Sequence, residues 1–356
     1  MREMTVKAAK PVRSVNPDRK RAGVFLAKVL IGVFASLGIF SVFLLTQSQN
    51  PLTVYEALIQ CFVGSQYNVG EIAVKMTPVL LAGMAALIPA KVGLSNCGGE
   101  GQLIAGCLTA NIVGVYLCGN LPGVIGIPVM LIAAAAAGML WAAIPLFCRM
   151  KLNMNETLTT LLSNYIMYRL VAYLVFGPIQ DTAGNNYPMS ARIAEQLRIP
   201  SFTGTRANFM IFFALFVVLI VWFVFSRTEL GFRLRAIGGN ERAAQFAGFS
   251  VQKARCMAFL TAGAIAGLGG GILMSSVEFQ MRESTAHDLG FLGFLATGIA
   301  GGSPIVSIFT SFLLSALSVC GTSLEITTGL RSSASTILMS VILLTIFALG
   351  RRKRAK

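Results

Sequence analysis

The chain has 356 residues, of which 55% are hydrophobic and 12% charged, and its formal net charge is +15 at pH 7. Soluble domains carry about 25% charged residues, so this composition excludes an ordinary soluble protein. The apolar residues form blocks long enough for helices that cross a bilayer, whereas a membrane β-barrel would show short alternating segments. We therefore predict an all-α, polytopic integral membrane protein.

The predicted organisation is a basic cytoplasmic tail at residues 1–22, a transmembrane domain at 23–350 and a second basic tail at 351–356. A short helix outside the membrane is predicted between the first two spans. We predict ten spans, at residues 24–45, 73–90, 103–117, 124–147, 158–175, 209–225, 257–274, 289–299, 305–320 and 334–349. The eighth is too short to cross as a plain helix, so a half-helix is one expectation there.

The distribution of basic residues predicts the orientation of these spans. The predicted inside segments hold 21 Lys and Arg residues, and the predicted outside loops hold five. The positive-inside rule therefore places both termini in the cytoplasm. The same rule accounts for the net charge without a nucleic-acid partner, because no basic groove with interleaved aromatic residues is present.

The chain has seven cysteines and a single histidine, His287. The cysteine number is odd, no C-x-x-C pair occurs, and most cysteines lie in or beside apolar runs. We interpret them as small buried hydrophobic residues rather than disulfides or metal ligands, and we predict no metal site. No phosphate-binding loop, metalloprotease motif or nucleophile elbow occurs, so we predict that the chain is not an enzyme and that a partner hydrolyses any ATP.

A basic segment at residues 226–255 separates two apolar runs. A solvated loop that fixes the orientation and a docking element for a soluble partner explain this segment about equally well. The docking hypothesis predicts a short helix over residues 240–247, capped by Asn240 and ended by Gly248. Its small-residue face would consist of Ala243, Ala244 and Ala247.

A glycine-rich break at residues 91–102 carries three side chains that can bind a polar solute: Asn96, Glu100 and Gln102. Broken helices line solute pathways in transporters, although a plain cytoplasmic turn is the simpler interpretation from position alone. In the fifth span, Asn164 must find a partner on a neighbouring helix or on a substrate, and Arg169 is expected to face protein or water.

Two overlapping G-x-x-x-G steps in the seventh span predict close helix packing, either within this chain or with a second subunit. The residues concerned are Gly263, Gly267 and Gly271.

Four stretches together are similar to a known family. They read K-V-G-L-S-N-C-G-G-E-G-Q at 91–102, N-E-T-L-T-T-L-L-S-N-Y at 155–165, G-F-R-L-R-A-I-G-G-N-E-R-A-A-Q-F-A-G at 231–248 and T-A-G-A-I-A-G-L-G-G at 261–270. In this order and spacing they resemble permease subunits of bacterial ABC importers of the branched-chain amino acid/simple-sugar permease family. The resemblance is greatest to the nucleoside-type branch, which works with a basic-membrane-protein-type receptor.

The resemblance implies a ten-helix permease in the bacterial plasma membrane. Its expected partners are membrane lipids, a second homologous permease in a heterodimer, an ATPase with two cassettes that holds ATP and Mg²⁺, and an extracytoplasmic substrate-binding lipoprotein. No cofactor is expected on this chain. The resemblance also implies a substrate pathway that includes Asn96, Glu100, Gln102, Asn164 and Tyr165, and an ATPase-coupling segment at 231–250 that includes Arg233, Arg235, Gly239, Asn240, Ala243, Ala244 and Gly248.

One position departs from the nucleoside-type pattern. Relatives commonly read G-F-D-G near the eighth span, where this chain has Leu292 in place of the acid. We therefore expect an importer permease for a nucleoside or a related simple sugar. The alternative is a secondary transporter driven by an ion gradient, which would need buried unpaired acids; only Glu100 comes near this, and the basic segment would then have no role.

Overall fold

The computed structural model describes residues 17–64, 66–181 and 187–328, together with 334, 336–338, 340, 341, 344 and 345. Within these residues the structure is helical, and its β-structure is limited to three isolated bridges between loops. The chain divides into two compact units, Met1–Pro51 with Ile337–Lys356, and Leu52–Thr336.

The first unit contains α1 (Pro17–Thr46), which includes the first predicted span. The Ser36 and Thr345 hydroxyl oxygens lie 2.6 Å apart, and the Thr345 hydroxyl also donates to the Gly32 carbonyl at 3.1 Å. These contacts join α1 to the described part of the tenth predicted span. The rest of that span lies outside the described residues.

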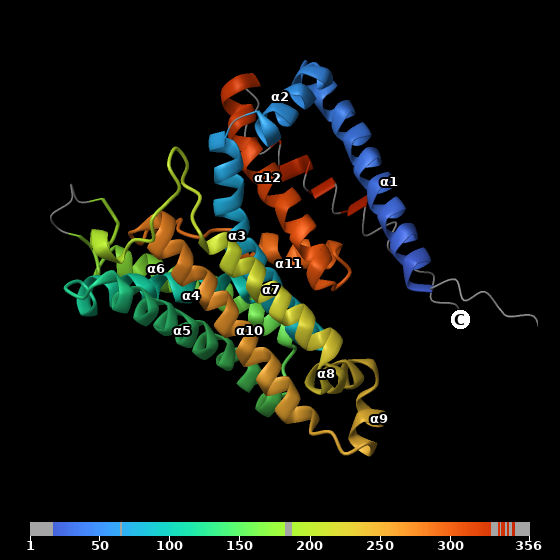
Figure 1. Cartoon of the computed structure of the whole chain (residues 1–356), viewed down its shortest axis with the longest axis vertical. Coiled ribbons are helices and arrows are strands. Elements are labelled where there is room, and N and C mark those ends of the chain that lie inside the picture. Colours follow the sequence, from blue (N-terminus) through green and yellow to red (C-terminus); the bar gives the residue numbers. More distant parts are fainter. Residues whose placement is uncertain are drawn as a thin grey trace, which may run out of the picture. The chain divides into compact units, whose positions relative to one another are not determined.

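The second unit contains the remaining helices (Figure 1). In chain order they are α2 (Pro51–Val63), α3 (Gln66–Ala90), α4 (Gly99–Ile112) continued by the π-helical η1 (Val113–Leu117), α5 (Gly123–Leu152), α6 (Glu156–Val175), η2 (Glu195–Leu197), α7 (Met210–Arg227), α8 (Glu229–Gly239), α9 (Glu241–Phe246), α10 (Val251–Leu273) continued by the π-helical η3 (Met274–Glu278), α11 (Leu289–Ile299) and α12 (Pro304–Thr328).

Nine of the ten predicted spans coincide with described helices, and α11 has the bounds predicted for the eighth span. Five helical stretches of the described chain are long and apolar enough to cross a membrane: Gln66–Ala90, Gly123–Leu152, Met210–Arg227, Val251–Glu278 and Pro304–Gly321. The predicted all-helical fold is thereby confirmed for the described residues, and the five apolar stretches agree with predicted membrane spans. The number of crossings and the side on which the termini lie remain predictions.

Helix α10 lies at the centre of the second unit, against α3, α4 and α5. A methyl group added at Gly267 would collide with the Ala134 carbonyl oxygen of α5, and one added at Gly263 would meet the Gly138 carbonyl oxygen. Gly271 faces α5 in the same way. The neighbour of the glycine face is therefore within this chain, where close backbone approach packs α10 onto α5.

The long loop between α6 and α7 packs against η3, at the end of α10 that lies opposite α8 and α9. The segment before α7 runs beside η3 and the residue that follows it: Ile199 N–H donates to Ser275 O at 2.8 Å, and Ile193 N–H donates to Phe279 O at 2.8 Å. The Arg198 guanidinium lies 5.1 Å from the centre of the Phe279 ring. These contacts hold the long loop against the end of η3.

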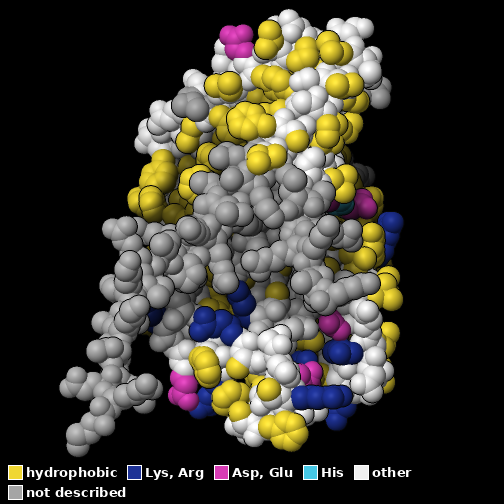
Figure 2. All heavy atoms as spheres, turned by 90° about the vertical axis from the view of Figure 1, so that its right-hand side faces the viewer, with side chains coloured by type: hydrophobic (Ala, Val, Ile, Leu, Met, Phe, Trp, Pro, Cys, Tyr) yellow, Lys and Arg dark blue, Asp and Glu magenta, His cyan; other side chains and the backbone are white. Residues whose placement is uncertain are grey.

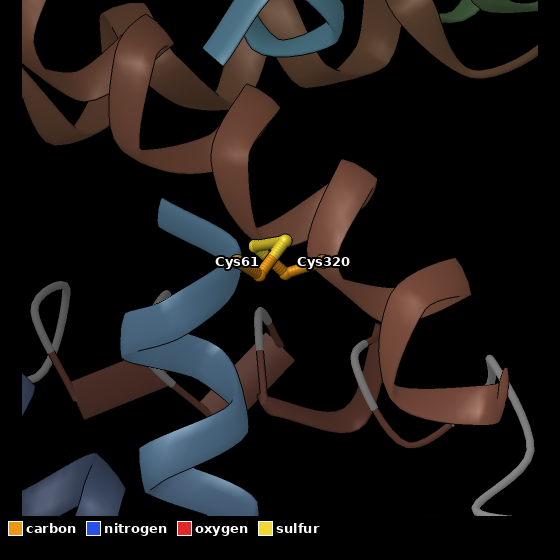
Figure 3. The surroundings of a disulfide bond; sticks show 2 residues. All are labelled: Cys61 and Cys320. Carbon is orange, nitrogen blue, oxygen red and sulfur yellow. A yellow bond between two sulfur atoms is a disulfide. The ribbon is translucent and has the colours of Figure 1, made fainter. Parts of the chain in front are cut away.

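A disulfide joins Cys61 of α2 to Cys320 of α12 (Figure 3), with their Cα atoms 5.7 Å apart. The prediction that the cysteines form no disulfide is therefore wrong for this pair, while Cys97, Cys107, Cys118, Cys148 and Cys256 are free. The two residues are separated by 259 positions, and only the packing of α2 beside α12 brings them together. Disulfides persist in oxidising compartments, which supports an extracytoplasmic position for α2 and for the part of α12 around Cys320.

Basic side chains gather at the other end. On the face shown in Figure 2, Lys and Arg side chains cluster around the end that holds α8 and α9, while the opposite end is mostly apolar and uncharged. This division follows the positive-inside pattern of the sequence.

Candidate functional site

The break between α3 and α4 is organised by two amides. The Asn96 Nδ2 donates to Gln102 Oε1 at 3.1 Å and to the Ala85 carbonyl of α3 at 3.0 Å. In return, Gln102 Nε2 donates to Asn96 Oδ1 at 3.2 Å, and the Gly98 N–H donates to the same oxygen at 3.0 Å. Both side chains are buried. This reciprocal pair satisfies backbone and side-chain groups that the interrupted helix leaves open.

Asn164 links α6 to the same break. Its Oδ1 accepts from Gly101 N–H at 2.9 Å, and its Nδ2 donates to the Cys97 carbonyl at 2.9 Å. The side chain is fully buried. The amide therefore acts as a bridge between the first turn of α4 and the middle of α6.

Glu100 holds the start of α11. Its carboxylate is fully buried and accepts from the backbone N–H groups of Asp288 at 2.5 Å, Gly290 at 2.5 Å and Phe291 at 3.1 Å. The Tyr168 hydroxyl of α6 donates to it at 2.9 Å. A helix N-terminus has unpaired N–H groups and a partial positive charge, so a carboxylate from another helix stabilises it. We define the buried polar cluster as Asn96, Glu100, Gln102, Asn164 and Tyr168.

The five residues predicted to line the pathway thus fall into two groups. Asn96, Glu100, Gln102 and Asn164 are buried and hydrogen-bonded within the chain, whereas Tyr165 is 58% exposed on α6. A role in solute passage stays a prediction for all five. Sequence reasoning missed Tyr168, although it stands one turn after Asn164 on the same helix.

Tyr165 belongs to a continuous exposed face of α6, which we call the α6 face. It consists of Leu158, Leu162, Tyr165, Ile166, Arg169 and Tyr173. These positions recur at helical spacing and form one stripe. The Arg169 guanidinium forms no hydrogen bond or ion pair with any described residue, so it requires protein or water outside this chain.

The basic segment forms two helices. The Asn240 side chain caps α9 by accepting from Ala243 N–H at 3.1 Å, and Gly248 follows the helix with φ +81°. Both features agree with the sequence prediction. Helix α8 was not predicted; it begins because Thr228 Oγ1 accepts from Gly231 N–H at 3.2 Å, and Glu229 supplies a carboxylate in the first turn.

The predicted small-residue face of α9 is wrong in one respect. Ala244 is only 3% exposed and packs into the hydrophobic core of this chain, because the helix must bury one side against its own neighbours. Ala243 and Ala247 are exposed. The outermost side chain is Phe246, 92% exposed, which sequence reasoning missed.

The other predicted coupling residues lie on or beside α8. Arg233 pairs with Glu229, and its guanidinium lies 5.7 Å from the centre of the Phe249 ring. Gly239 is exposed at the end of the helix. Arg235 and Lys91 line a small cavity of about 270 Å³, where burial and then the Arg235 charge lower the pKa of Lys91.

Helix α8 also rests on the break itself. A methyl group added at Gly238 would collide with the Lys91 carbonyl oxygen, so glycine is needed for this close approach. The turn continues through Gly93, at φ +78°, towards Asn96. The basic segment is therefore in direct contact with the chain that leads into the buried polar cluster.

Among the described residues, no three His, Cys, Asp or Glu side chains are grouped in a way that could hold a metal ion. The expectation that this chain binds no cofactor is not decided by that observation and stays an expectation.

Comparison with known proteins places these features in a family. A family model described as "Branched-chain amino acid transport system / permease component" matches residues 68–349. The chain is 30% identical over 328 residues to the glucose ABC transporter permease protein TsgB13 of Haloferax volcanii, covering 88% of this chain and 85% of that protein. It is 29% identical to the guanosine ABC transporter permease protein NupP of Bacillus subtilis (91% and 96% covered) and 28% identical to the nucleoside ABC transporter permease protein NupB of Lactococcus lactis (82% and 83%).

The family match covers more than half of the chain, and the relatives align along most of their own length. Permeases of this family are the membrane components of ABC transporters, which also contain ATPase and substrate-binding partners. This chain is therefore a transport component and not an enzyme. The protein belongs to the family of permease components of branched-chain amino acid transport systems.

Proposed function

We propose that this chain is the transmembrane permease subunit of an ATP-driven importer for a nucleoside or a related simple sugar, in a bacterial plasma membrane. Family membership supports the permease role, and the names of the relatives point to guanosine, nucleosides and glucose as candidate solutes. Leu292, in place of the acid common in nucleoside-type permeases, leaves the simple sugar as a full candidate beside the nucleoside.

The observation that carries the proposal is the exposed helix α9. It is a short helix with a capped start, it lies between the ends of α7 and α10, and it presents Phe246 outwards. An exposed aromatic residue on a small rigid helix fits a groove on a soluble partner. In the proposed complex that partner is an ATPase with two cassettes, which binds ATP and Mg²⁺, and this chain binds no cofactor.

Two sets of contacts supply a route for motion from α9 into the membrane. Glu241 of α9 forms a two-bond ion pair with Arg255 of α10, at 2.8 and 3.0 Å. Helix α8 rests on the turn at Lys91, which leads to the polar cluster and, through Glu100, to α11. Displacement of α8 and α9 by the ATPase would therefore act on α10 and on α11 together.

The α6 face supports the presence of a second permease. Arg169 lies within the fifth predicted span and has no partner among the described residues, and a charge exposed to lipid there would be costly. A homologous permease packed on this face, with a polar pathway beside Tyr165, would remove that cost. A heterodimer served by an extracytoplasmic lipoprotein receptor is the assembly that we propose.

The coupling role is tested with Phe246→Asp. Because Phe246 is 92% exposed, the change removes no internal packing, and the variant should insert and fold normally. We expect the ATPase to bind the permeases more weakly by about 2 kcal/mol or more, as for an aromatic residue at the centre of an interface. Retention of the ATPase on the purified permeases and uptake of radiolabelled guanosine and glucose are the measurements.

Phe176→Asp is the matched control. Phe176 is 57% exposed and directly follows the C-terminal end of α6, so the same change is made far from α9. Wild-type ATPase retention and uptake in Phe246→Asp would remove the coupling assignment, and a wild-type complex that carries neither solute would remove the proposed substrate class.

A further inference from the structure

A cavity of about 560 Å³ with a mixed polar and apolar lining lies at the end of the second unit opposite α8 and α9. It is formed by the first turns of α3, by η3, by the loop before α11 and by α12. The side chains that matter for its chemistry are Tyr67, Glu71, Lys75, Arg206, Glu278 and His287. Its volume lies in the range of small-molecule binding sites, which is roughly 300–1,000 Å³.

Several charged groups of this cavity lack hydrogen-bond or ion-pair partners among the described residues. The Lys75 ammonium and the Glu278 carboxylate form no hydrogen bond or ion pair with any described residue. Glu71 binds Arg206 through one oxygen at 3.4 Å, and its other carboxylate oxygen is buried without a partner. Lys75 stands ten residues into a membrane-spanning helix, where a charge is retained only at a considerable cost. These groups are therefore available to a polar molecule that enters the cavity.

The backbone around the cavity departs from regular structure at several points. Glu278 is the last residue of the π-helical turn η3, and Phe279 follows it with φ +59°. Ala286 and Asp288, on either side of His287, have φ +65° and φ +66°. Such conformations cost free energy in residues other than glycine and concentrate at functional sites. Here they orient Glu278 and His287 at the same cavity.

An aromatic row connects the cavity to the α6 face. The His287 ring stacks on the Tyr168 ring, with centroids 4.9 Å apart and planes at 18°, and Tyr168 meets Tyr165 edge to face at 6.3 Å. Tyr67 lines another part of the cavity. Ring faces of this kind pack against planar bases and against the apolar faces of sugar rings.

We propose that this cavity binds the transported solute and that its ligand is a neutral, polyhydroxylated ring compound, either a free sugar or the ribose of a nucleoside. Glu71 and Glu278 accept hydrogen bonds from hydroxyl groups, Lys75 donates one, and His287 packs against a ring face. The cavity gives no reason to expect an anionic ligand, because the carboxylates of Glu71 and Glu278, with that of Asp288 acting on Lys75, are not outnumbered by the two cations Lys75 and Arg206. This assignment rests on the function proposed above and deepens it.

Uptake by the whole importer tests the assignment. The wild-type complex, reconstituted in proteoliposomes with its own receptor and ATPase, is compared with Lys75→Met and Glu278→Gln for uptake of radiolabelled guanosine and glucose. We expect each change to lower uptake about tenfold, the effect of losing roughly 1.4 kcal/mol of solute binding. Retention of the ATPase should be unchanged, since both residues lie at the end opposite α9. The matched controls Lys151→Met and Glu195→Gln change exposed residues outside the cavity and outside the basic segment, and they should transport normally.

Thiol accessibility gives a second readout that does not depend on turnover. Ser284→Cys places a thiol on the cavity wall, where an impermeant maleimide added from outside should label it above the wild-type background. Saturating guanosine or glucose should slow that labelling at least about threefold. Equal uptake by cavity and control variants, with no protection of the thiol and with intact wild-type transport, would overturn the cavity assignment alone. Failure of the wild-type complex to carry either solute would overturn the proposed function and the assignment that rests on it.

Discussion

Two sets of polar side chains lie within the helical core of the second unit, and they differ in how their hydrogen-bonding groups are satisfied. In the buried polar cluster, Glu100 accepts four hydrogen bonds and Asn164 makes two, all with this chain. In the cavity, Lys75 and Glu278 make none with any described residue. Polar groups at membrane depth are costly in both places, but only the first set recovers that cost inside the chain.

This contrast separates structural polar residues from residues available to a ligand. The cluster fixes α4, α6 and α11 relative to one another through bonds to backbone groups. In the cavity, Lys75 and Glu278 have no hydrogen bond or ion pair with the described part of the chain, while Glu71 and Arg206 pair with each other. Removing a cluster residue should therefore lower the stability of the subunit, whereas removing the charge of Lys75 or Glu278 should preserve or raise stability while lowering transport.

Glu100→Ala is expected to have the largest effect on stability. The change leaves three backbone N–H groups at the start of α11 and the Tyr168 hydroxyl without their acceptor. Each buried group left unsatisfied costs about 1–3 kcal/mol, so the total loss should exceed about 3 kcal/mol. Thermal unfolding of the purified subunit in mild detergent, followed by size exclusion, is the measurement.

Glu283→Ala is the control for that change, because Glu283 lies on the loop before α11 but is exposed. Its melting temperature should equal that of the wild type. Equal melting temperatures for Glu100→Ala and Glu283→Ala would mean that the start of α11 does not depend on the carboxylate, and the structural assignment of the cluster would be lost.

Asn164→Leu should have an intermediate effect. Leucine has nearly the same volume but cannot accept from Gly101 N–H or donate to the Cys97 carbonyl. We expect a loss of about 1–3 kcal/mol, and uptake per assembled complex should stay close to that of the wild type. Asn155→Leu removes an exposed helix cap with no role in the cluster, and it should cost only ~1 kcal/mol. A stable Asn164→Leu variant with strongly reduced uptake would instead make Asn164 a pathway residue.

The elements that could be predicted from sequence are those defined by local signals. The start of α9 follows from the capping side chain of Asn240, and its end precedes Gly248. The bounds of α11 follow from its apolar run and from the break at residues 301–304, where Gly301 and Gly302 have φ +62° and +73°. Caps and breaks act within a few residues, so the sequence contains all that determines them.

The features that could not be predicted from the sequence depend on tertiary contacts. Glu100 meets backbone groups 188 to 191 positions away, and Cys61 meets a cysteine 259 positions away. Spacing in the sequence holds no trace of either contact. The inward orientation of Ala244 depends likewise on which side of α9 meets the core. Lys75 did leave a signal, as the one charged residue within the apolar run at 73–90.

Lys75→Met should have the smallest effect on stability, and the opposite sign to the cluster variants. The change replaces an unpaired ammonium in a membrane-spanning helix with an apolar side chain of similar length, so the melting temperature should rise slightly, by the equivalent of ~1 kcal/mol. Lys253→Met, on the exposed surface at the start of α10, should leave it unchanged. A marked loss of stability in Lys75→Met alone would show that the ammonium supports the fold. Stability and transport would then fall together in this variant, as expected for a residue that holds helices in place. Lys75 would have to be assigned to the structural residues and not to the ligand-binding ones.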